Sequence, residues 1–404
     1  MIKSVKLGEV ARISSGGTPS RANPSYWNGN IPWVKTTQIQ NCVITPQDVD
    51  EWITEEGLKN SSAKMVPAGT IVLGMIGQGK TRGQVGYLSF DACTNQNAAT
   101  ITCGKECDSW FVYQYLLFNY ENIRALSNSS GQGNLNLGLV EIIPITLPPL
   151  LQQKKIANLL GTWDNAIEKT EALIAAKEKQ FEWLKSQLLL NNPKSKRWNT
   201  SALGEFIVEK KEKSTTPDLY PCLTSSRRGI FLQEDYFSKQ VASKDNSGYK
   251  IMSRGDFTFR SMSDDGLFVF NKQTIIDKGL ISPAYGVFSP KQNMDSDFLY
   301  YFLNSPAFRR ALSREVQGGT RTALKLNALK KLEVKIPCIQ EQKHIASKLN
   351  ITKKEIDLVK ELLEKYRSQK RGLMQKLLTG DWQVTSAQVG AEGELQDRTK
   401  ENVA

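Results

Sequence analysis

The feature that most constrains this chain is an internal repeat. Residues 147–189 match residues 336–378 without a gap, at a constant offset of 189 residues and with 12 identical positions in 43. Composition alone would supply roughly two or three identities. The pairs Pro148/Pro337 and Gln153/Gln342 mark the start of the two copies. A duplication of this length predicts two related halves that contain the same elements in the same order.

Both copies carry a heptad pattern. Apolar residues recur at alternating steps of four and three over more than four heptads, which is typical of a coiled coil rather than of a surface helix on a globular core. We therefore expect two long helices whose apolar seam is buried. The main seam positions are Ile156, Leu160, Ile167, Ile174, Leu184, Ile345, Leu349, Ile356, Leu363 and Leu373.

The segments outside these helices are rich in short β-type runs interrupted by Gly, Pro and Asn. They predict two α+β domains, each with one helix, near 109–126 and 296–315. We expect the polar tail to be disordered. The predicted order is a first domain over 1–147, a helix over 148–192, a basic linker over 193–198, a second domain over 199–336, a helix over 337–380 and the tail over 381–404.

The charge balance favours a polyanionic partner. The formal net charge is +12, and cations set against phosphates release counterions; a basic protein without such a partner is the alternative. No apolar run is long enough to span a membrane, and no signal peptide begins the chain. Six scattered cysteines are typical of a reducing cytoplasm. Cys93, Cys103 and Cys107 match no standard zinc spacing, so we expect no metal site.

Residues 74–81 fit the phosphate-loop pattern GxxxxGK[ST]. Nucleotide binding also needs a helix that begins at the lysine. The glycines and β-type run after Lys80 favour a hairpin instead, with Lys80 and Arg82 placed against DNA phosphates. Motifs of metalloproteases, serine hydrolases, dinucleotide-binding enzymes and amino-methyltransferases are absent. The sequence therefore predicts a binding protein that is not an enzyme and has no cofactor of its own.

Short motifs occur in a characteristic order: Lys6-Leu-Gly-Glu-Val10, Ser15-Gly-Gly-Thr-Pro19, Asn30-Ile-Pro-Trp33, Thr94-Asn-Gln96 and Leu147-Pro-Pro149. Together with the duplication, they give a chain that resembles the specificity (S) subunits of type I restriction–modification systems, more closely in the first half than in the second. The resemblance implies two target-recognition domains, each reading one half of a bipartite double-stranded DNA site. It implies two antiparallel coiled-coil helices with pseudo-twofold symmetry, which set the spacer and dock partners.

The implied partners are two methyltransferase (M) subunits that use S-adenosylmethionine and restriction (R) subunits driven by ATP. The rival interpretations are a stand-alone DNA-binding regulator and a coiled-coil scaffold. Paired basic domains disfavour the scaffold.

Side chains able to contact bases or phosphates are the candidate DNA contacts. We expect Gly17, Pro19, Trp27 and Trp33 to be structural. The candidates are Lys35, Thr36, Thr37, Gln38, Lys80, Arg82, Gln84, Asn95 and Gln96 in the first domain, and Arg227, Arg228, Arg260, Arg321 and Lys325 in the second.

Overall fold

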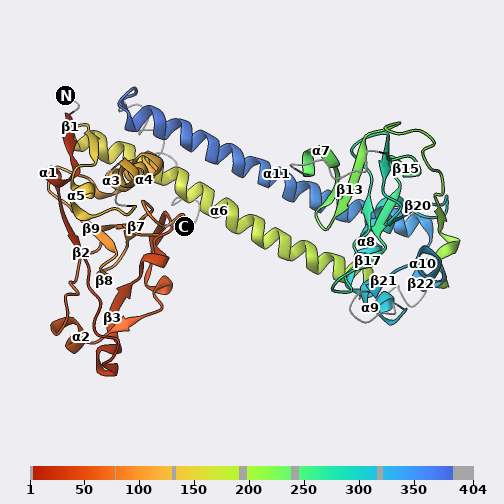
Figure 1. The fold of residues 1–404 in the computed structure, drawn as a ribbon, viewed down its shortest axis with the longest axis horizontal. Helices are drawn as coiled ribbons and strands as arrows, with labels where there is room; N and C mark the ends of the chain where they lie inside the picture. The colour runs from red at the N-terminus through yellow and green to blue at the C-terminus, as the bar shows by residue number, and fades with distance from the viewer. Residues whose placement is uncertain are drawn as a thin grey trace, which may run out of the picture. The chain divides into compact units, whose positions relative to one another are not determined.

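In the computed structural model the chain divides into two compact units. One unit comprises Met1–Thr170 with Leu362–Ala404, and the other comprises Glu171–Glu361. Each contains one α+β domain and parts of two long helices, α6 (Leu150–Leu189) and α11 (Ile339–Leu378) (Figure 1). The residues described are 3–77, 79–129, 133–190, 198–237, 245–315 and 322–384.

The first domain contains a five-stranded sheet whose central strand is completely buried. Ile71, Val72 and Leu73 of that strand have no exposed surface, as expected of an apolar strand covered on both faces. The sheet is antiparallel except at its β7–β4 edge. Its order is β2 (Ala11–Ser15), β9 (Ala98–Cys103), β6 (Ile71–Gly74), β7 (Val85–Leu88) and β4 (Cys42–Ile44).

A smaller sheet, short helices and a strand pair complete the first domain. The predicted helix over 109–126 is broken at Asn119, which caps the end of one helix before a second one begins. The sheet is β5 (Trp52–Ile53), β3 (Trp27–Val34) and β8 (Cys93–Thr94). The strand pair is β1 (Lys3–Lys6) and β10 (Pro144–Leu147). The helices are α1 (Leu7–Val10), α2 (Glu55–Lys59), α3 (Ser109–Phe118), α4 (Tyr120–Ser129) and α5 (Leu137–Glu141), with 3-10 turns at Pro24–Tyr26, Thr36–Gln38 and Pro46–Asp48.

The second domain contains two four-stranded sheets, one over a core rich in phenylalanine and the other over a smaller aliphatic cluster. Phe257, Phe259, Phe270, Phe288 and Phe298 are completely buried in the phenylalanine-rich core. One sheet is β12 (Ile207–Glu209), β20 (Tyr285–Pro290), β16 (Phe257–Arg260) and β18 (Asn271–Lys272). The other is β14 (Gly229–Leu232), β13 (Cys222–Ser226), β19 (Lys278–Ile281) and β15 (Lys250–Ser253).

Two strand pairs and further helices complete this domain. The predicted helix over 296–315 is interrupted before Pro306, which cannot donate a helical hydrogen bond. The pairs are β11 (Asn199–Ala202) with β22 (Glu333–Ile336) and β17 (Met262–Ser263) with β21 (Thr322–Ala323). The helices are α7 (Gln233–Tyr236), α8 (Ser296–Leu303), α9 (Pro306–Glu315) and α10 (Leu326–Lys331), with a 3-10 turn at Leu203–Glu205.

The two domains share one topology. The order β2-β9-β6-β7 corresponds to β12-β20-β16-β18, and β5-β3-β8 corresponds to β14-β13-β19. The corresponding pairs β3–β8 and β13–β19 are both parallel. The pairing of β15 with β19 in the second domain corresponds to a single β-bridge between Val66 and Ala92 in the first. Each domain also pairs its first strand with the strand that precedes its long helix. The duplication inferred from sequence is thus confirmed for the strands that the two domains share.

A buried glutamine joins each domain to its long helix. Gln153 and Gln342 are both 1% exposed. The Oε1 of Gln153 accepts the backbone N–H of Asp108 at 2.8 Å, and its Nε2 donates to Glu106 O and Pro148 O at 3.0 and 2.9 Å. Gln342 repeats this set with Asp295 N, Asn293 O and Pro337 O. Asp108 and Asp295 in turn cap α3 and α8. The joint therefore fixes each domain's capped helix to the start of α6 or α11.

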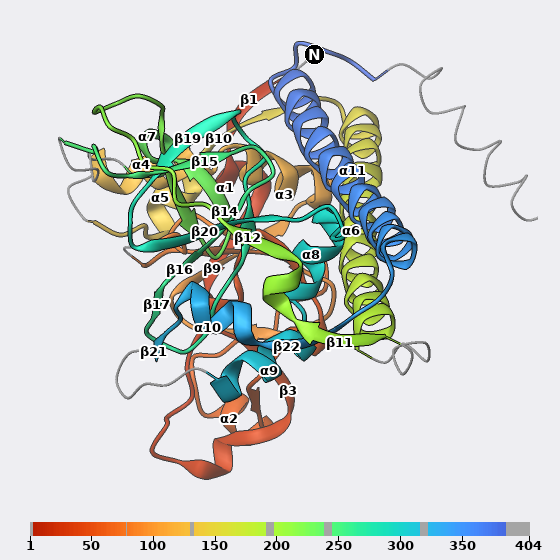
Figure 2. The ribbon, with the colours of Figure 1, turned by 90° about the vertical axis from the view of Figure 1, so that its right-hand side faces the viewer.

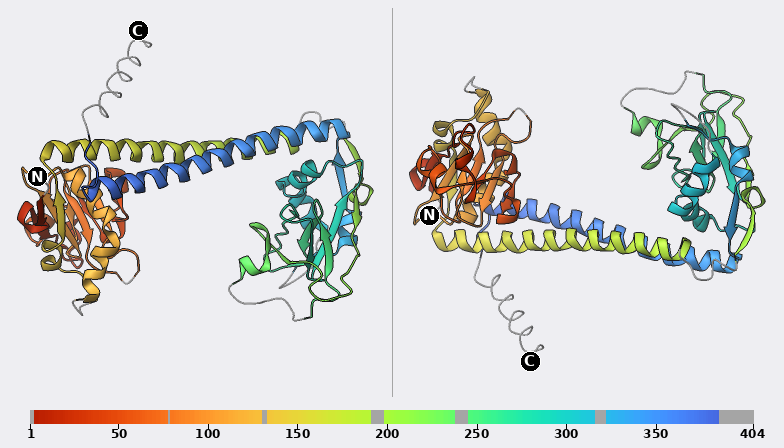
Figure 3. Two further views of the ribbon diagram at one scale, coloured as in Figure 1. Left: turned by 90° about the horizontal axis from the view of Figure 1, so that it is seen from above. Right: turned by 90° about the horizontal axis from the view of Figure 1, so that it is seen from below.

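The long helices run antiparallel, and the predicted seam faces inward. In the first unit the Trp163 and Tyr366 rings meet edge to face, and Asp164 pairs with Lys370. In the second unit Lys177 pairs with Glu355 at 2.6 Å. The views of Figures 2 and 3 agree on this course of α6 and α11. Of the ten seam positions, Ile156, Leu160, Ile174, Ile345, Leu349, Ile356 and Leu363 are buried, and Ile167, Leu184 and Leu373 are half-buried.

The end of the described chain departs from expectation. Residues 381–384 belong to the tail that we expected to be disordered, yet Val384 is buried in the first unit's core. Its carbonyl accepts a hydrogen bond from Gln152 at 3.2 Å. A single apolar residue close to α11 is enough to anchor this segment, and composition averaged over the tail hides it. The remaining tail, 385–404, and residues 193–197 of the linker lie outside the described residues.

Candidate functional site

Three loops distant in sequence meet at one end of the first domain's strands. They follow β3 (residues 35–41), join β6 to β7 (75–84) and follow β8 (95–97). Thr36 Oγ1 donates to Asn95 Oδ1 at 2.8 Å. The backbone N–H of Val85 donates to Asn41 Oδ1 at 3.0 Å. These bonds draw together most of the candidate contacts that the sequence identified in this domain.

Two of these loops, 35–41 and 75–84, line a shallow hollow of about 540 Å³ together with α4, and its charged residues are Lys80, Glu121 and Arg124. Lys80 is exposed there and Gln84 is half-buried. Tyr120 donates its hydroxyl to Lys80 O at 2.7 Å and accepts from Arg124 at 3.0 Å. Ammonium, guanidinium and amide groups together can hold phosphate oxygens and base edges. Asn41 and Arg124 were missed by sequence reasoning, because each lies far along the chain from Lys80.

Two candidate contacts in this domain are corrected. Thr36 and Arg82 are both only 8% exposed. The Arg82 guanidinium donates inward to Gly133 O, since the turn between β6 and β7 directs it beneath the surface. The Thr36 hydroxyl is used by Asn95. Both side chains stabilise the loops and are too buried to be DNA contacts.

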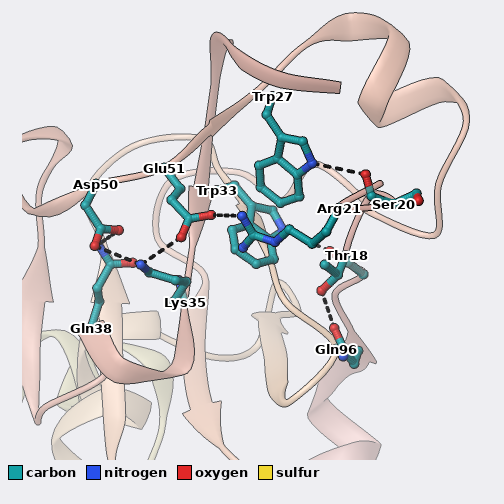
Figure 4. Close-up of polar contacts among 11 residues, drawn as sticks. Thr18, Ser20, Arg21, Trp27, Trp33, Lys35, Gln38, Asp50, Glu51 and Gln96 are labelled. Carbon is teal, nitrogen blue, oxygen red and sulfur yellow. Dashed lines mark hydrogen bonds and ion pairs between the residues drawn. The ribbon is translucent and has the colours of Figure 1, made fainter. Parts of the chain in front are cut away.

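Lys35 and Gln38 are occupied by acidic and backbone groups (Figure 4). The Lys35 ammonium lies 2.8 Å from Asp50 and 2.9 Å from Glu51. Hydrogen bonding to Asp50, with that to Glu51, raises the pKa of Lys35. Gln38 accepts from Lys35 N at 2.7 Å and donates to Asp48 O. A cation between two carboxylates attracts phosphate weakly, so both residues are poorer contact candidates than the sequence suggested.

Beside this network, the tryptophans are structural, as expected. Trp33 is buried and donates its indole N–H to Gly17 O at 2.8 Å. Trp27 packs edge to face on it at 5.2 Å, with the Arg21 guanidinium 3.7 Å from the Trp27 ring centre. A Cβ on Gly17 would lie 2.3 Å from Ser62, so a larger residue there cannot fit. Thr37 and Gln96 are exposed, and Gln96 accepts from Thr18.

A hollow of about 640 Å³ in the second domain is lined by two of the candidate cations, Arg227 and Arg260, and by aromatic rings. Arg227 and Arg228 occupy the turn between β13 and β14. Lys325 is exposed beside the ladder that pairs β17 with β21, and Leu324 N donates to Ser261 O at 2.9 Å. Arg321 lies outside the described residues.

Two corresponding connections line part of each hollow. The β3–β5 connection of the first domain contains residues 35–51, and its counterpart is the β13–β14 turn that contains Arg227. The β6–β7 connection contains Lys80, and its counterpart, from β16 to β18, contains Asp265. The sheets are thus repeated, whereas these two connections differ in length and in side chains.

The phosphate-loop pattern forms no nucleotide cradle of the usual kind. Residues 79–83 form turns, and β7 then pairs antiparallel with β6. The chain therefore continues as a hairpin where a helix would have to begin. Gln78 of this loop is outside the described residues.

Within the described residues, no group of three or more His, Cys, Asp and Glu side chains could hold a metal ion. Burial raises the pKa of Cys103 to about 12 and that of Cys107 to about 11. None of the described helices combines the length and the apolar character needed to cross a membrane.

Comparison with known proteins decides the family. The model of the type I restriction modification DNA specificity domain matches residues 2–178 and again residues 195–365. The chain belongs to this family. The double match corresponds to the two halves of the internal repeat.

The chain is also similar to named specificity subunits of type I restriction enzymes. The MjaVIII specificity subunit of Methanocaldococcus jannaschii is 21% identical over 94% of this chain and 92% of its own length. The MjaIX specificity subunit of the same organism is 25% identical over 59% of this chain and 61% of that protein. The chain thus matches about three fifths of the MjaIX subunit's length.

Solved structures share the fold. The S subunit of a type I system from M. genitalium superposes with a TM-score of 0.54 at 14% identity, over 94% of this chain and 96% of that one. A chain from a structure that describes complex assembly and conformational transition of the type I R-M system gives a TM-score of 0.58 at 17% identity, over 94% and 98%. The fold of two α+β domains joined by antiparallel coiled-coil helices is therefore confirmed.

Proposed function

We propose that this chain is the DNA-sequence-reading subunit of a type I restriction–modification complex, with each domain reading one half of a bipartite site. The observation that carries the proposal is the paired hollow. The same two connections of a duplicated topology form a loop cluster in both domains, with different side chains in each. Repeated sheets with divergent loops suit one scaffold that recognises two different sequences.

The chain's own part in the reaction is binding and positioning, and it carries no catalytic step. Phosphate contacts from Lys80, Arg260 and Lys325 would fix the register on the duplex, while amides and arginines would read base edges. Methyl transfer would be performed by two M subunits with S-adenosylmethionine, and cleavage by R subunits with ATP. The antiparallel helices would dock the M subunits and set the distance between half-sites. We place the complex in the cytoplasm.

Domain exchange tests this assignment. Residues 1–147 are replaced by the equivalent domain of a relative, and the chain is expressed with its methyltransferase partner. Sequencing of methylated sites in host DNA should show a change in one half of the recognised sequence, because each domain has its own core and its own loops. A change in both halves, or in neither, would contradict independent reading.

A stand-alone regulator would behave differently. It would bind its sequence with full affinity as a single chain, whereas a specificity subunit gains affinity from the methyltransferase chains. Titration of labelled DNA with the chain alone and with the assembled complex separates the two.

A further inference from the structure

We propose that Arg227 reads a guanine in the half-site of the second domain, and that Asp265 holds its guanidinium in place for that base. The proposal rests on the proposed function and identifies a residue that sets its specificity. Arg227 and Asp265 come from the two divergent connections and form an ion pair, in which Arg227 lines the hollow and Asp265 follows the lining residue Asp264.

The backbone that carries Arg227 is anchored from below. Asn271 is 5% exposed, and its Nδ2 donates to Ser225 Oγ at 2.8 Å and to Ser226 O at 2.7 Å. The N–H of Arg228 donates to Ser226 Oγ at 3.1 Å. The turn therefore presents Arg227 from a fixed base, as accurate recognition requires.

Asp265 is itself held in one orientation. Its Oδ1 accepts from Ser263 Oγ at 3.0 Å and from Leu267 N at 3.2 Å, which leaves Oδ2 to accept from Arg227 Nη2 at 2.5 Å. These bonds, with that from Arg227 the strongest, lower the pKa of Asp265 to about 2. The carboxylate is thus ionised at neutral pH and directs a planar guanidinium.

The chemistry of the pair favours a base edge over a phosphate. A phosphate beside Arg227 would also lie near the Asp265 carboxylate, and like charges repel. The ion pair uses one hydrogen of Nη2, so hydrogens on Nη2 and Nη1 can still donate in the plane of the group. Guanine presents O6 and N7 as two neighbouring acceptors in the major groove, and an arginine fork fits them bidentately.

Exposed ion pairs are common and usually contribute little, so location distinguishes this one. Arg254 forms a similar exposed pair with Asp277 at 3.0 Å, but Arg254 does not line the hollow, whereas Arg227 does. Arg227 is 62% exposed at the side chain and lies at the topological position that residues 35–51 occupy in the first domain. Arg254 therefore serves as a matched control in the same unit.

The experiment uses the full chain assembled with its methyltransferase subunits. The recognised site is first determined by methylation sequencing. Binding is then measured with duplexes in which each base pair of the second domain's half-site is changed in turn, at several salt concentrations. The variants are Arg227→Ala, Arg227→Lys, Asp265→Asn and the control Arg254→Ala, and thermal melting verifies their folding.

Arg227→Ala and Arg227→Lys should lose about 10- to 100-fold of discrimination at one guanine and keep it elsewhere. The lysine variant keeps the charge but lacks the fork, so its salt dependence should be unchanged. Asp265→Asn should relax the same position more mildly. Arg254→Ala should leave specificity intact.

Several results would overturn the proposal: a half-site without guanine, an unchanged base preference, or a uniform loss of affinity in which the salt slope falls by about one. That last result would mark Arg227 as a phosphate contact. A wild-type complex that recognises no bipartite sequence would instead overturn the proposed function, and this proposal with it.

Discussion

Replacing Gln153 with leucine should loosen the attachment of the first domain to α6. Leucine occupies nearly the same volume, so the cavity contribution is small. Three hydrogen bonds disappear, and the N–H of Asp108 and the carbonyls of Glu106 and Pro148 are left without this partner. At about 1 kcal/mol per bond, and more for each group that stays buried without a partner, the change should cost about 3 to 5 kcal/mol.

The adjacent residue provides the control. Gln152 is half-buried on the same helix, and its Nε2 donates to Val384 O at 3.2 Å. Gln152→Leu should therefore cost about 1 kcal/mol. Gln342→Leu repeats the main change in the second unit, where the same three bonds exist. The effects of the two joint variants should be additive, because the residues lie in different units.

Amide hydrogen exchange measures how far each variant loosens the capped helix that its glutamine holds. Gln153→Leu should increase exchange of the α3 amides over Ser109–Phe118 and leave those of α8 over Ser296–Leu303 unchanged, and Gln342→Leu should do the reverse. In the assembled complex both variants should accept a wider range of spacers while the half-site bases remain the same. Equal exchange in α3 of wild type and variant, or a destabilisation no larger than that of Gln152→Leu, would refute the reasoning.

Three further changes test the helices and the first hollow. Ile356 is 1% exposed whereas Ile167 is half-buried, so Ile356→Asp should destabilise the chain and its methyltransferase assembly more than Ile167→Asp does, as thermal melting and co-purification will show. Lys80→Ala should lower the slope of log affinity against log salt by about one. If the purified chain hydrolysed ATP and Lys80→Ala abolished that activity, the nucleotide-binding interpretation would be restored. One heptad inserted after both Ala175 and Glu364 keeps the seam and adds about 10.5 Å, so methylation of a spacer library should shift toward gaps roughly three base pairs longer; efficient methylation at the original gap would contradict a ruler.

The two long helices and the internal repeat could be predicted because apolar residues recur periodically and identical residues recur at a constant offset. The predicted ranges 148–192 and 337–380 match α6 and α11 to within three residues at each end, and the matched prolines and glutamines mark where the two copies start. The breaks within the shorter helices were missed. Asn119 and Asn304 cap the ends of α3 and α8, while the apolar pattern continues across both breaks.

The candidate contacts were harder to predict, because residue type does not reveal which way a side chain points. Arg82 and Lys80 are two residues apart in one loop, yet Arg82 turns inward to Gly133 while Lys80 remains exposed. Lys35 is cationic, but it forms ion pairs with Asp50 and Glu51, which follow β4 along the chain. Such pairings depend on tertiary contacts that a single sequence does not display.

The distribution of similarity between the halves has a physical reason. Strands and buried joints must satisfy backbone hydrogen bonds and fill a core, so both copies keep the same order and the same glutamine. The connections β3–β5 and β13–β14 differ: one holds seventeen residues, 35–51, and includes β4 and the buried Ile39 and Ile44, while the other is the turn of Arg227 and Arg228. Variation at these two points lets each domain present its own contacts while the strands that the two domains share keep their order. A chain that must read two unrelated half-sites from one scaffold needs this separation of rigid sheets from variable connections.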